Sequence, residues 1–218
     1  MSYSPIIKIC GVRSPKILEA VIETGADMVG FVHFPRSPRH VELDPLTEMI
    51  SLARGRIESV VLLVNPDNSQ VAEIAALDPD WIQLHGPESP HRVDAIRAGA
   101  GIPILKAIGI GASNDLDQIG PYEEVCDRLL LDAKAPKNSE LPGGRGVAFD
   151  WQVLAGLDQE VGFMLSGGLT PKNVGEALKK VRPLGIDVSS GVEREPGVKD
   201  AALIADFISA ARAAAAEL

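Results

Sequence analysis

Four apolar runs of the sequence end at a side chain that can take part in proton transfer. Cys10 ends the run in KICGV, His85 follows WIQL, Asp132 follows three leucines in RLLLDAKAP, and Asp187 opens DVSSGVE. A thiol and a carboxyl group can serve as general base and general acid, because burial and neighbouring charges tune their pKa values. Each residue also has an ordinary interpretation. A buried cysteine is usually a small core residue, and Lys134 is a ready ion-pair partner for Asp132.

Two stretches rich in glycine and serine indicate an anion site. Ser166-Gly167-Gly168 precedes a helical pattern with Thr170 as its cap, and Ser189-Ser190-Gly191 follows the last apolar run. Glycines allow a backbone to approach an anion closely, and the N–H groups at a helix start supply donors. The alternative is ordinary turn geometry. We expect a phosphate site formed by Gly167, Gly168, Ser189, Ser190 and Gly191.

Two further loops carry residues suited to holding a substrate. Arg36 and Arg39 stand in FVHFPRSPRHV, where they either contact an anionic group or form a solvated loop. The stretch LPGGRGVAFDW, with Gly143, Gly144 and Gly146, has the length and composition of a mobile lid. A merely flexible surface loop is the alternative interpretation.

The chain alternates between short apolar runs and helical patterns. Predicted strands cover Ile6–Cys10, Met28–Val32, Ser59–Val64, Trp81–His85, Ile104–Ile108, Leu129–Asp132, Phe163–Leu165 and Ile186–Ser189. Helices are expected at Pro15–Thr24, Ser69–Leu77, Ser89–Ala98, Pro171–Val181 and Lys199–Leu218, with weaker patterns at Asn114–Ile119 and Trp151–Leu154. Eight buried strands alternating with helices predict a single α/β domain over residues 1–218, a (β/α)8 TIM barrel with its active site at the carboxyl ends of the strands. A doubly wound open sheet remains the alternative.

Composition excludes some partners and favours a location. The formal net charge is −9, which argues against nucleic acid and anionic membranes as partners. The two cysteines lie far apart in sequence and show no metal-binding spacing. No secretory leader or run long enough to span a membrane is evident, so we expect a cytoplasmic protein.

The ordered set of motifs resembles the phosphoribosylanthranilate isomerase family of tryptophan biosynthesis. The stretches that carry the resemblance are KICGV, GADMVGFVHFPRSPR, IQLHG, LLLDAKAP, GGRGVAFDW, LSGGLTPKNV and DVSSGVEREPGVKD. The resemblance implies a (β/α)8 barrel without a metal or other cofactor. It also implies an Amadori rearrangement of N-(5'-phosphoribosyl)anthranilate, a phosphosugar joined to anthranilate, to an aminoketose. His33 and Arg145 depart from the usual family pattern.

The resemblance also assigns roles to the candidate residues. It implies that Cys10 is the general base, that Asp132 is the general acid and that Arg39 holds the anthranilate carboxylate. We expect His85 and Asp187 to bind the substrate as well. A thiol near cationic groups is expected to ionise near neutral pH, and an aspartic acid among leucines to stay partly protonated. Either a monomer or a homodimer is compatible with the sequence.

Two other functions remain open at this point. A metal-dependent phosphosugar epimerase or isomerase would use His33, His85, Asp132 and Asp187 as ligands, although the histidines lack HxH or HExxH spacing. A non-catalytic barrel that only binds a phosphosugar would keep the phosphate loops but lose the acid or the base, and this chain retains both.

Overall fold

Eight parallel strands close into a barrel in the computed structural model, which describes residues 3–134, 150–157 and 161–218. The strands are β1 (Ile6–Cys10), β2 (Met28–Val32), β3 (Glu58–Leu63), β4 (Trp81–Leu84), β5 (Ile104–Ile110), β6 (Arg128–Ala133), β7 (Phe163–Leu165) and β8 (Gly185–Val188). Each strand pairs with the next along the chain, and β8 pairs with β1. That last pairing confirms the predicted barrel over the open sheet.

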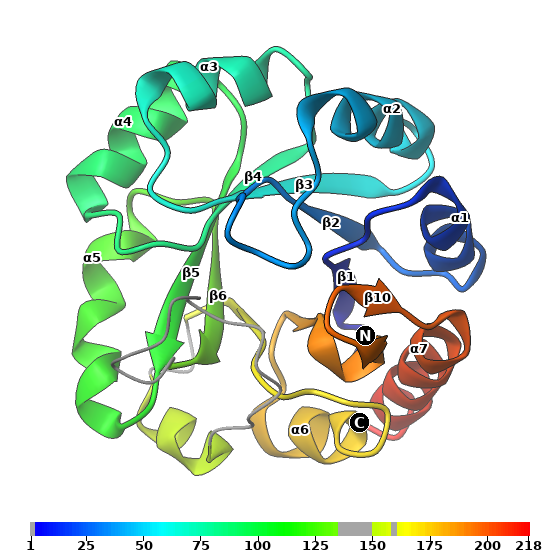
Figure 1. Ribbon diagram of the computed structural model, residues 1–218. Coiled ribbons are helices and arrows are strands. Elements are labelled where there is room, and N and C mark those ends of the chain that lie inside the picture. The colour runs from blue at the N-terminus through cyan, green and yellow to red at the C-terminus, as the bar shows by residue number, and fades with distance from the viewer. Residues whose placement is uncertain (1–2, 135–149, 158–160) are drawn as a thin grey trace.

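The helices form a ring around the strands in chain order (Figure 1). The α-helices are α1 (Pro15–Glu23), α2 (Leu43–Ala53), α3 (Asn68–Ala75), α4 (Pro90–Ala100), α5 (Gly120–Glu123), α6 (Val174–Val181) and α7 (Ala201–Ala215). Three short 3-10 helices are η1 (Ser113–Gln118), η2 (Trp151–Gly156) and η3 (Ser190–Val192). The weak patterns around residues 114–119 and 151–154 are therefore 3-10 helices. No helix within the described ranges is long and apolar enough to cross a membrane.

Local sequence explains how α1 begins and what it buries. The Ser14 hydroxyl accepts a hydrogen bond from the backbone N–H of Ile17, and Pro15 occupies the first helical turn, where its missing N–H costs nothing. Leu18 and Val21 lie one turn apart on the buried face. The same combination of a serine cap and an early proline begins α4 at Ser89 and Pro90.

Several elements differ from the sequence-based expectations. Helices α2 and α5 were absent from the predicted helices. The helix after Gly167-Gly168 begins at Val174 rather than Pro171, because residues 170–173 form a turn closed by the Asn173 side chain. The last helix begins at Ala201 and is preceded by an unpredicted hairpin of β9 (Glu193–Glu195) and β10 (Val198–Lys199).

The barrel interior changes character along its axis. Side chains alternate along each strand between the interior and the helices. Its middle is packed by apolar side chains, namely Met28, Val60, Leu105, Ala107, Leu130 and Met164. Toward the carboxyl ends the interior positions are polar or reactive instead: Lys8, Cys10, Gln83, Asp132 and Asp187. The apolar layer therefore forms the floor of a polar mouth. The predicted lid glycines Gly143, Gly144 and Gly146, together with Arg145, lie outside the described residues.

Candidate active site

Cys10 is the last residue of β1 and its side chain faces the barrel mouth. The residue is only 4% exposed. Burial raises the pKa of its thiol above the usual range, and Asp187 adds to the increase. The positive charges of Lys8 and Lys199 offset only part of it. The expectation of a thiol that ionises near neutral pH is therefore wrong, because desolvation outweighs the nearby cations.

Asp132 is held by two contacts, one from the backbone of its neighbour Ala133 and one from His85 at the end of β4. Its Oδ1 accepts from the backbone N–H of Ala133 at 2.8 Å, and its Oδ2 lies 3.1 Å from Nε2 of His85. The other imidazole nitrogen, Nδ1, lies 2.9 Å from Nε2 of Gln83. The interior positions of the intervening strand β5 are small there, Ala107 and Gly109, so His85 can reach Asp132 across it. Asp132 and His85 thus form one acid–base pair.

A continuous set of contacts connects the thiol to the carboxylate around the barrel wall. Lys8 lies two residues before Cys10 on the same face of β1, and its Nζ donates to Oδ1 of Asp187 on β8 at 2.7 Å. Asp187 Oδ2 accepts from the Ser166 hydroxyl at 3.1 Å. A Cβ built on the next residue, Gly167, would lie 3.0 Å from Oδ1 of Asp132. The predicted base and acid therefore belong to one polar network at the carboxyl ends of the strands.

The two loops predicted to bind phosphate touch each other. A Cβ on Gly191 would lie 1.8 Å from the carbonyl oxygen of Leu169, so only glycine permits this approach. Gly167 has φ +88°, in the left-handed region, and a Cβ there would lie 2.5 Å from the backbone nitrogen of Ala133. The structure therefore brings the loops after β7 and β8 together beside Asp132. A long helix does not start directly behind these glycines, which leaves the loop backbone and η3 as the source of N–H donors.

Arg39 lies in the mouth but is already engaged. Its Nε and Nη2 donate to the two carboxylate oxygens of Glu193, both at 2.7 Å. Lys199 donates to the same carboxylate at 2.6 Å and to the backbone oxygen of Ser189 at 2.9 Å. Burial alone would raise the pKa of Glu193, but Arg39 and Lys199 hold it below its usual value. The hairpin thus connects the predicted carboxylate-binding arginine to the predicted phosphate loop.

The four ligands proposed for a metal do not gather. Nδ1 of His33 lies 2.9 Å from the backbone oxygen of Val41, Asp187 is bound to Lys8, and His85 is bound to Asp132. Within the described ranges, no three His, Cys, Asp or Glu side chains form a set that could hold a metal ion. Of the four proposed ligands, His85 and Asp132 contact each other, whereas His33 and Asp187 are bound to other groups.

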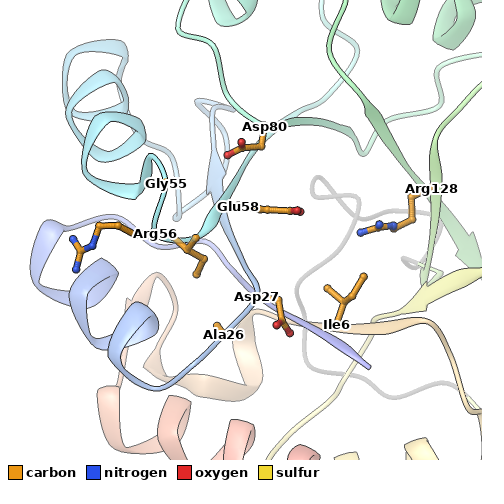
Figure 2. A pocket seen from close by; sticks show the side chains of 9 residues that line it. Ile6, Ala26, Asp27, Gly55, Arg56, Glu58, Asp80 and Arg128 are labelled. Carbon is orange, nitrogen blue, oxygen red and sulfur yellow. The ribbon is translucent and has the colours of Figure 1, made fainter. Parts of the chain in front are cut away.

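A separate cavity of about 590 Å³ opens at the opposite, amino-terminal end of the strands (Figure 2). Its lining includes Asp27, Glu58 and Asp80, and each carboxylate has a structural partner. Asp27 accepts from the backbone of Ile7, Asp80 from the backbone and hydroxyl of Ser59, and Glu58 from the indole of Trp81. These groups join neighbouring strands, as is typical of the stabilising face of such barrels.

Comparison with known proteins decides the family. The sequence model described as N-(5'-phosphoribosyl)anthranilate (PRA) isomerase matches residues 7–210. The chain belongs to this isomerase family. A relative of that name from Afipia carboxidovorans is 51% identical over 212 residues, which cover 97% of this chain and 91% of the relative. A second, from Mesorhizobium japonicum, is 49% identical over 209 residues, or 95% of each chain.

Solved isomerases have the same architecture. The phosphoribosyl anthranilate isomerase of Thermotoga maritima matches with a TM-score of 0.87 at 33% identity, covering 96% of this chain and all of that one. Another solved isomerase, in complex with reduced 1-(o-carboxyphenylamino)-1-deoxyribulose 5-phosphate, matches with a TM-score of 0.84 at 31% identity, with the same coverage of both chains.

Several residues of the isomerase site were missed in the sequence. Lys8, Gln83 and Ser166 stand in the interior of the mouth, and Glu193 and Lys199 form the hairpin contact. A signal was present for two of them. Lys8 and Gln83 each interrupt an apolar strand two residues before Cys10 and His85, which places both members of each pair on one face. Nothing local indicates the contact between Glu193 and Arg39, because the two residues are distant in sequence.

Substitution of Gly191 by alanine tests the contact between the two loops. The added Cβ would collide with the Leu169 backbone, so the loops must separate and donors to the phosphate move. A loss of about 1.5–3 kcal/mol of charge-assisted hydrogen bonding raises KM by roughly ten- to hundredfold. Steady-state kinetics measures this. Gly99→Ala is the matched control, since nothing lies within 4 Å of its Cβ position. A Gly191→Ala enzyme with the KM of Gly99→Ala would contradict the assignment.

Proposed function

We propose that Cys10 and Asp132 perform general base and general acid catalysis at the carboxyl end of this barrel. The chain is an isomerase of tryptophan biosynthesis. It converts N-(5'-phosphoribosyl)anthranilate to 1-(2-carboxyphenylamino)-1-deoxyribulose 5-phosphate. The observation that carries the residue assignment is the set of contacts from Cys10 through Lys8, Asp187 and Ser166 to the glycine beside Asp132. This set of contacts supports the placement of Cys10 and Asp132 at different positions around one barrel mouth.

The acid step opens the furanose ring. Asp132 delivers a proton to the ring oxygen as the C1–O bond breaks, and the anthranilate nitrogen lone pair forms the C1=N bond of a cationic Schiff base. In the structure Gln83 donates to Nδ1 of His85, so the imidazole proton lies on Nε2 and Asp132 accepts it as a carboxylate. This arrangement corresponds to the Asp132–His85 pair after it has given its proton to the substrate.

When the Asp132–His85 pair carries the proton to be transferred, the Gln83 amide needs a different orientation. When the extra proton sits on His85, or on Oδ2 of Asp132 where it is donated to Nε2, Nδ1 of the imidazole becomes an N–H donor and requires an acceptor. Gln83 Oε1 is buried and has no hydrogen-bond partner among the described residues. Turning the amide over would place this oxygen on Nδ1 and satisfy both groups. Gln83 is therefore suited to support both protonation states of the acid.

The base step moves a proton from C2. The Cys10 thiolate removes it, the C–H electrons form a C1=C2 bond, and the Schiff base nitrogen takes up the electrons of the C1=N bond. The resulting enolamine becomes the product ketone when C1 gains a proton and the C2 hydroxyl loses its own. Each proton transfer contributes about 10²–10⁴-fold. Cys10 works only as the thiolate, so its raised pKa limits the fraction of active base.

The two anionic ends of the substrate have distinct sites in this proposal. The joined loops after β7 and β8, containing Gly167, Gly168, Ser189, Ser190 and Gly191, hold the sugar phosphate. Arg39 holds the anthranilate carboxylate and shares its guanidinium with Glu193. The solved relative in complex with the reduced product analogue supports binding of a molecule of this class. Asp187 uses both oxygens within the protein, so we assign it to positioning Lys8 and Ser166.

The two alternative functions lack support. Two of the four proposed metal ligands, His33 and Asp187, are bound to other groups, and the relatives from Afipia carboxidovorans and Mesorhizobium japonicum and the solved protein from Thermotoga maritima are named for the isomerase reaction. A barrel that only binds phosphosugar would need neither the Asp132–His85 pair nor the buried base. Oligomeric state and cytoplasmic location stay predictions from the sequence.

Asp132→Asn removes the transferable proton while keeping the size of the side chain. Because the amide cannot protonate the ring oxygen, turnover is expected to fall by about 10²–10⁴-fold with a smaller change in KM. Loss of anthranilate fluorescence during turnover measures it. Asp127→Asn, at the amino-terminal end of the same strand, is the control, since Asp127 contacts only Ile104 and Arg97. An Asp132→Asn enzyme as active as the control would remove Asp132 from the acid role.

Cys10→Ser tests the base. A serine hydroxyl does not ionise in the pH range where the thiol does, so turnover should fall by about 10²–10⁴-fold while substrate binding persists. Kinetics and circular dichroism together separate lost chemistry from lost folding. Cys126→Ser is the control, because Cys126 packs in the outer core away from the mouth. Turnover equal to that of the control would exclude a catalytic thiol.

Arg39→Ala tests the carboxylate site. Losing a charge-assisted contact worth about 1.5–3 kcal/mol should raise KM by roughly ten- to hundredfold and change kcat much less. Lys199 still neutralises Glu193 in this variant, which limits the structural damage. Arg36→Ala, an exposed arginine of the same loop, serves as the comparison. Equal KM values for the two variants would argue against binding by Arg39.

A further inference from the structure

Lys8 is the most deeply buried charge near the proposed base. It is 0% exposed and lies in the interior of the barrel, directly above the apolar layer. Taking an ammonium group out of water costs several kcal/mol, and a buried ion pair is often no more stable than apolar residues of the same size. Its pairing with Asp187 at 2.7 Å explains how the charge is tolerated. It does not explain why a lysine stands there.

The position of Lys8 relative to Cys10 suggests the reason. The two side chains lie on one face of β1, and β2 presents Gly30 opposite Cys10. A Cβ built on Gly30 would lie 2.9 Å from Sγ of Cys10 and 3.2 Å from Nζ of Lys8. Thiol and ammonium therefore flank the same small space beside Gly30. A larger residue on β2 would separate the two side chains.

Three charged groups influence the thiol. Lys8 and Lys199 favour the thiolate, and Asp187 opposes it. Lys199 is paired with Glu193 at 2.6 Å and shares that single carboxylate with Arg39. Burial on its own would lower the pKa of Lys8, but Asp187 and Cys10 keep it above its usual value, so Lys8 remains an ammonium. Lys8 is consequently a permanent positive charge directly beside the thiol.

We propose that Lys8 is the counter-ion that stabilises the thiolate of Cys10, and that Asp187 both holds Lys8 in place and limits its effect. The inference rests on the proposed role of Cys10 as the base. Lys8 acts through Cys10 and needs no contact with the substrate, so it is a positioning residue.

The charge balance gives two predictions of opposite sign. In the native site Lys8 and Asp187 cancel, so ionisation of the thiol changes the net charge of the three groups from zero to −1. In Asp187→Asn the same ionisation changes the net charge from +1 to zero, which is easier in a buried site. In Lys8→Met the thiolate forms beside an unpaired carboxylate, which is harder. If the Lys8–Asp187 pair were purely structural, both variants would be less stable, but they would not shift the thiol pKa in opposite directions.

The experiment measures the thiol directly, without substrate. The folded protein is alkylated with iodoacetamide across a pH series, and the Cys10 peptide is quantified separately from the Cys126 peptide by mass spectrometry. At a fixed pH below the thiol pKa, Lys8→Met is expected to slow Cys10 alkylation at least about tenfold, which corresponds to a pKa increase of about one unit. Asp187→Asn is expected to accelerate it. The acid limb of the pH profile of kcat/KM should shift to higher pH in Lys8→Met and to lower pH in Asp187→Asn.

Matched variants guard against a folding artefact. Lys106→Met removes another buried lysine, which pairs with Glu88 on the helix side of β5, and should leave Cys10 alkylation unchanged. If Lys8→Met does not fold, the double variant Lys8→Met/Asp187→Asn removes the whole pair. It should still slow alkylation, because Nζ of Lys8 flanks the thiol beside Gly30, whereas Asp187 is on the neighbouring strand β8.

The outcomes separate this inference from the proposed function. Unchanged Cys10 alkylation in Lys8→Met or the double variant, or slower alkylation in Asp187→Asn, would overturn the role of Lys8. That result would leave the base assignment intact if Cys10→Ser were still inactive. Full activity of Cys10→Ser would instead refute the base, while the alkylation series would still report whether Lys8 sets the ionisation of the thiol.

Discussion

The cost of burying charge inside a closed barrel shapes the whole mouth. The parallel strands leave no edge, so a charged side chain that points inward is removed from water on every side. The buried charges are accordingly paired: Lys8 with Asp187, and both Arg39 and Lys199 with Glu193. Such pairs contribute little net stability, because the attraction between the charges mainly offsets their desolvation. Their value lies in holding functional groups at fixed positions.

These pairs also tie together loops that follow different strands. Glu193 on the short hairpin contacts Arg39 from the loop after β2 and, through Lys199, the backbone of Ser189 after β8. Asp187 connects β1 to Ser166 after β7. The two ends of the proposed substrate are therefore held by parts of one network. A change at Arg39 would reach the loop proposed to hold the phosphate through the buried contacts of Glu193 and Lys199.

The sequence predicted the strands that position the site better than the ionisation of the site residues. Continuous apolar runs require a covered parallel sheet, so the eight strands and the positions of Cys10 and Asp132 at the carboxyl ends of β1 and β6 followed from local patterns. The ionisation of Cys10 did not, because it depends on how far burial exceeds the effect of Lys8 and Lys199, a balance set by the three-dimensional arrangement. Likewise, Thr170 resembled a helix cap, but the side chain of Asn173 closes a turn there and delays the helix. Contacts between distant residues decided both results.

The neutrality of the Lys8–Asp187 pair suits the charges that the reaction creates. The substrate carries two anionic groups, and the chain has a formal net charge of −9, so binding cannot depend on overall attraction. In the proposed site, local backbone N–H groups and Arg39 supply the attraction. Ring opening then generates a cation at the Schiff base, close to a thiol whose ionisation is opposed by burial. A cation that appears beside Cys10 favours the thiolate at the step that needs it, since opposite charges attract strongly in a desolvated site. A neutral Lys8–Asp187 pair leaves room for that effect, whereas a bare ammonium would repel the Schiff base as it formed.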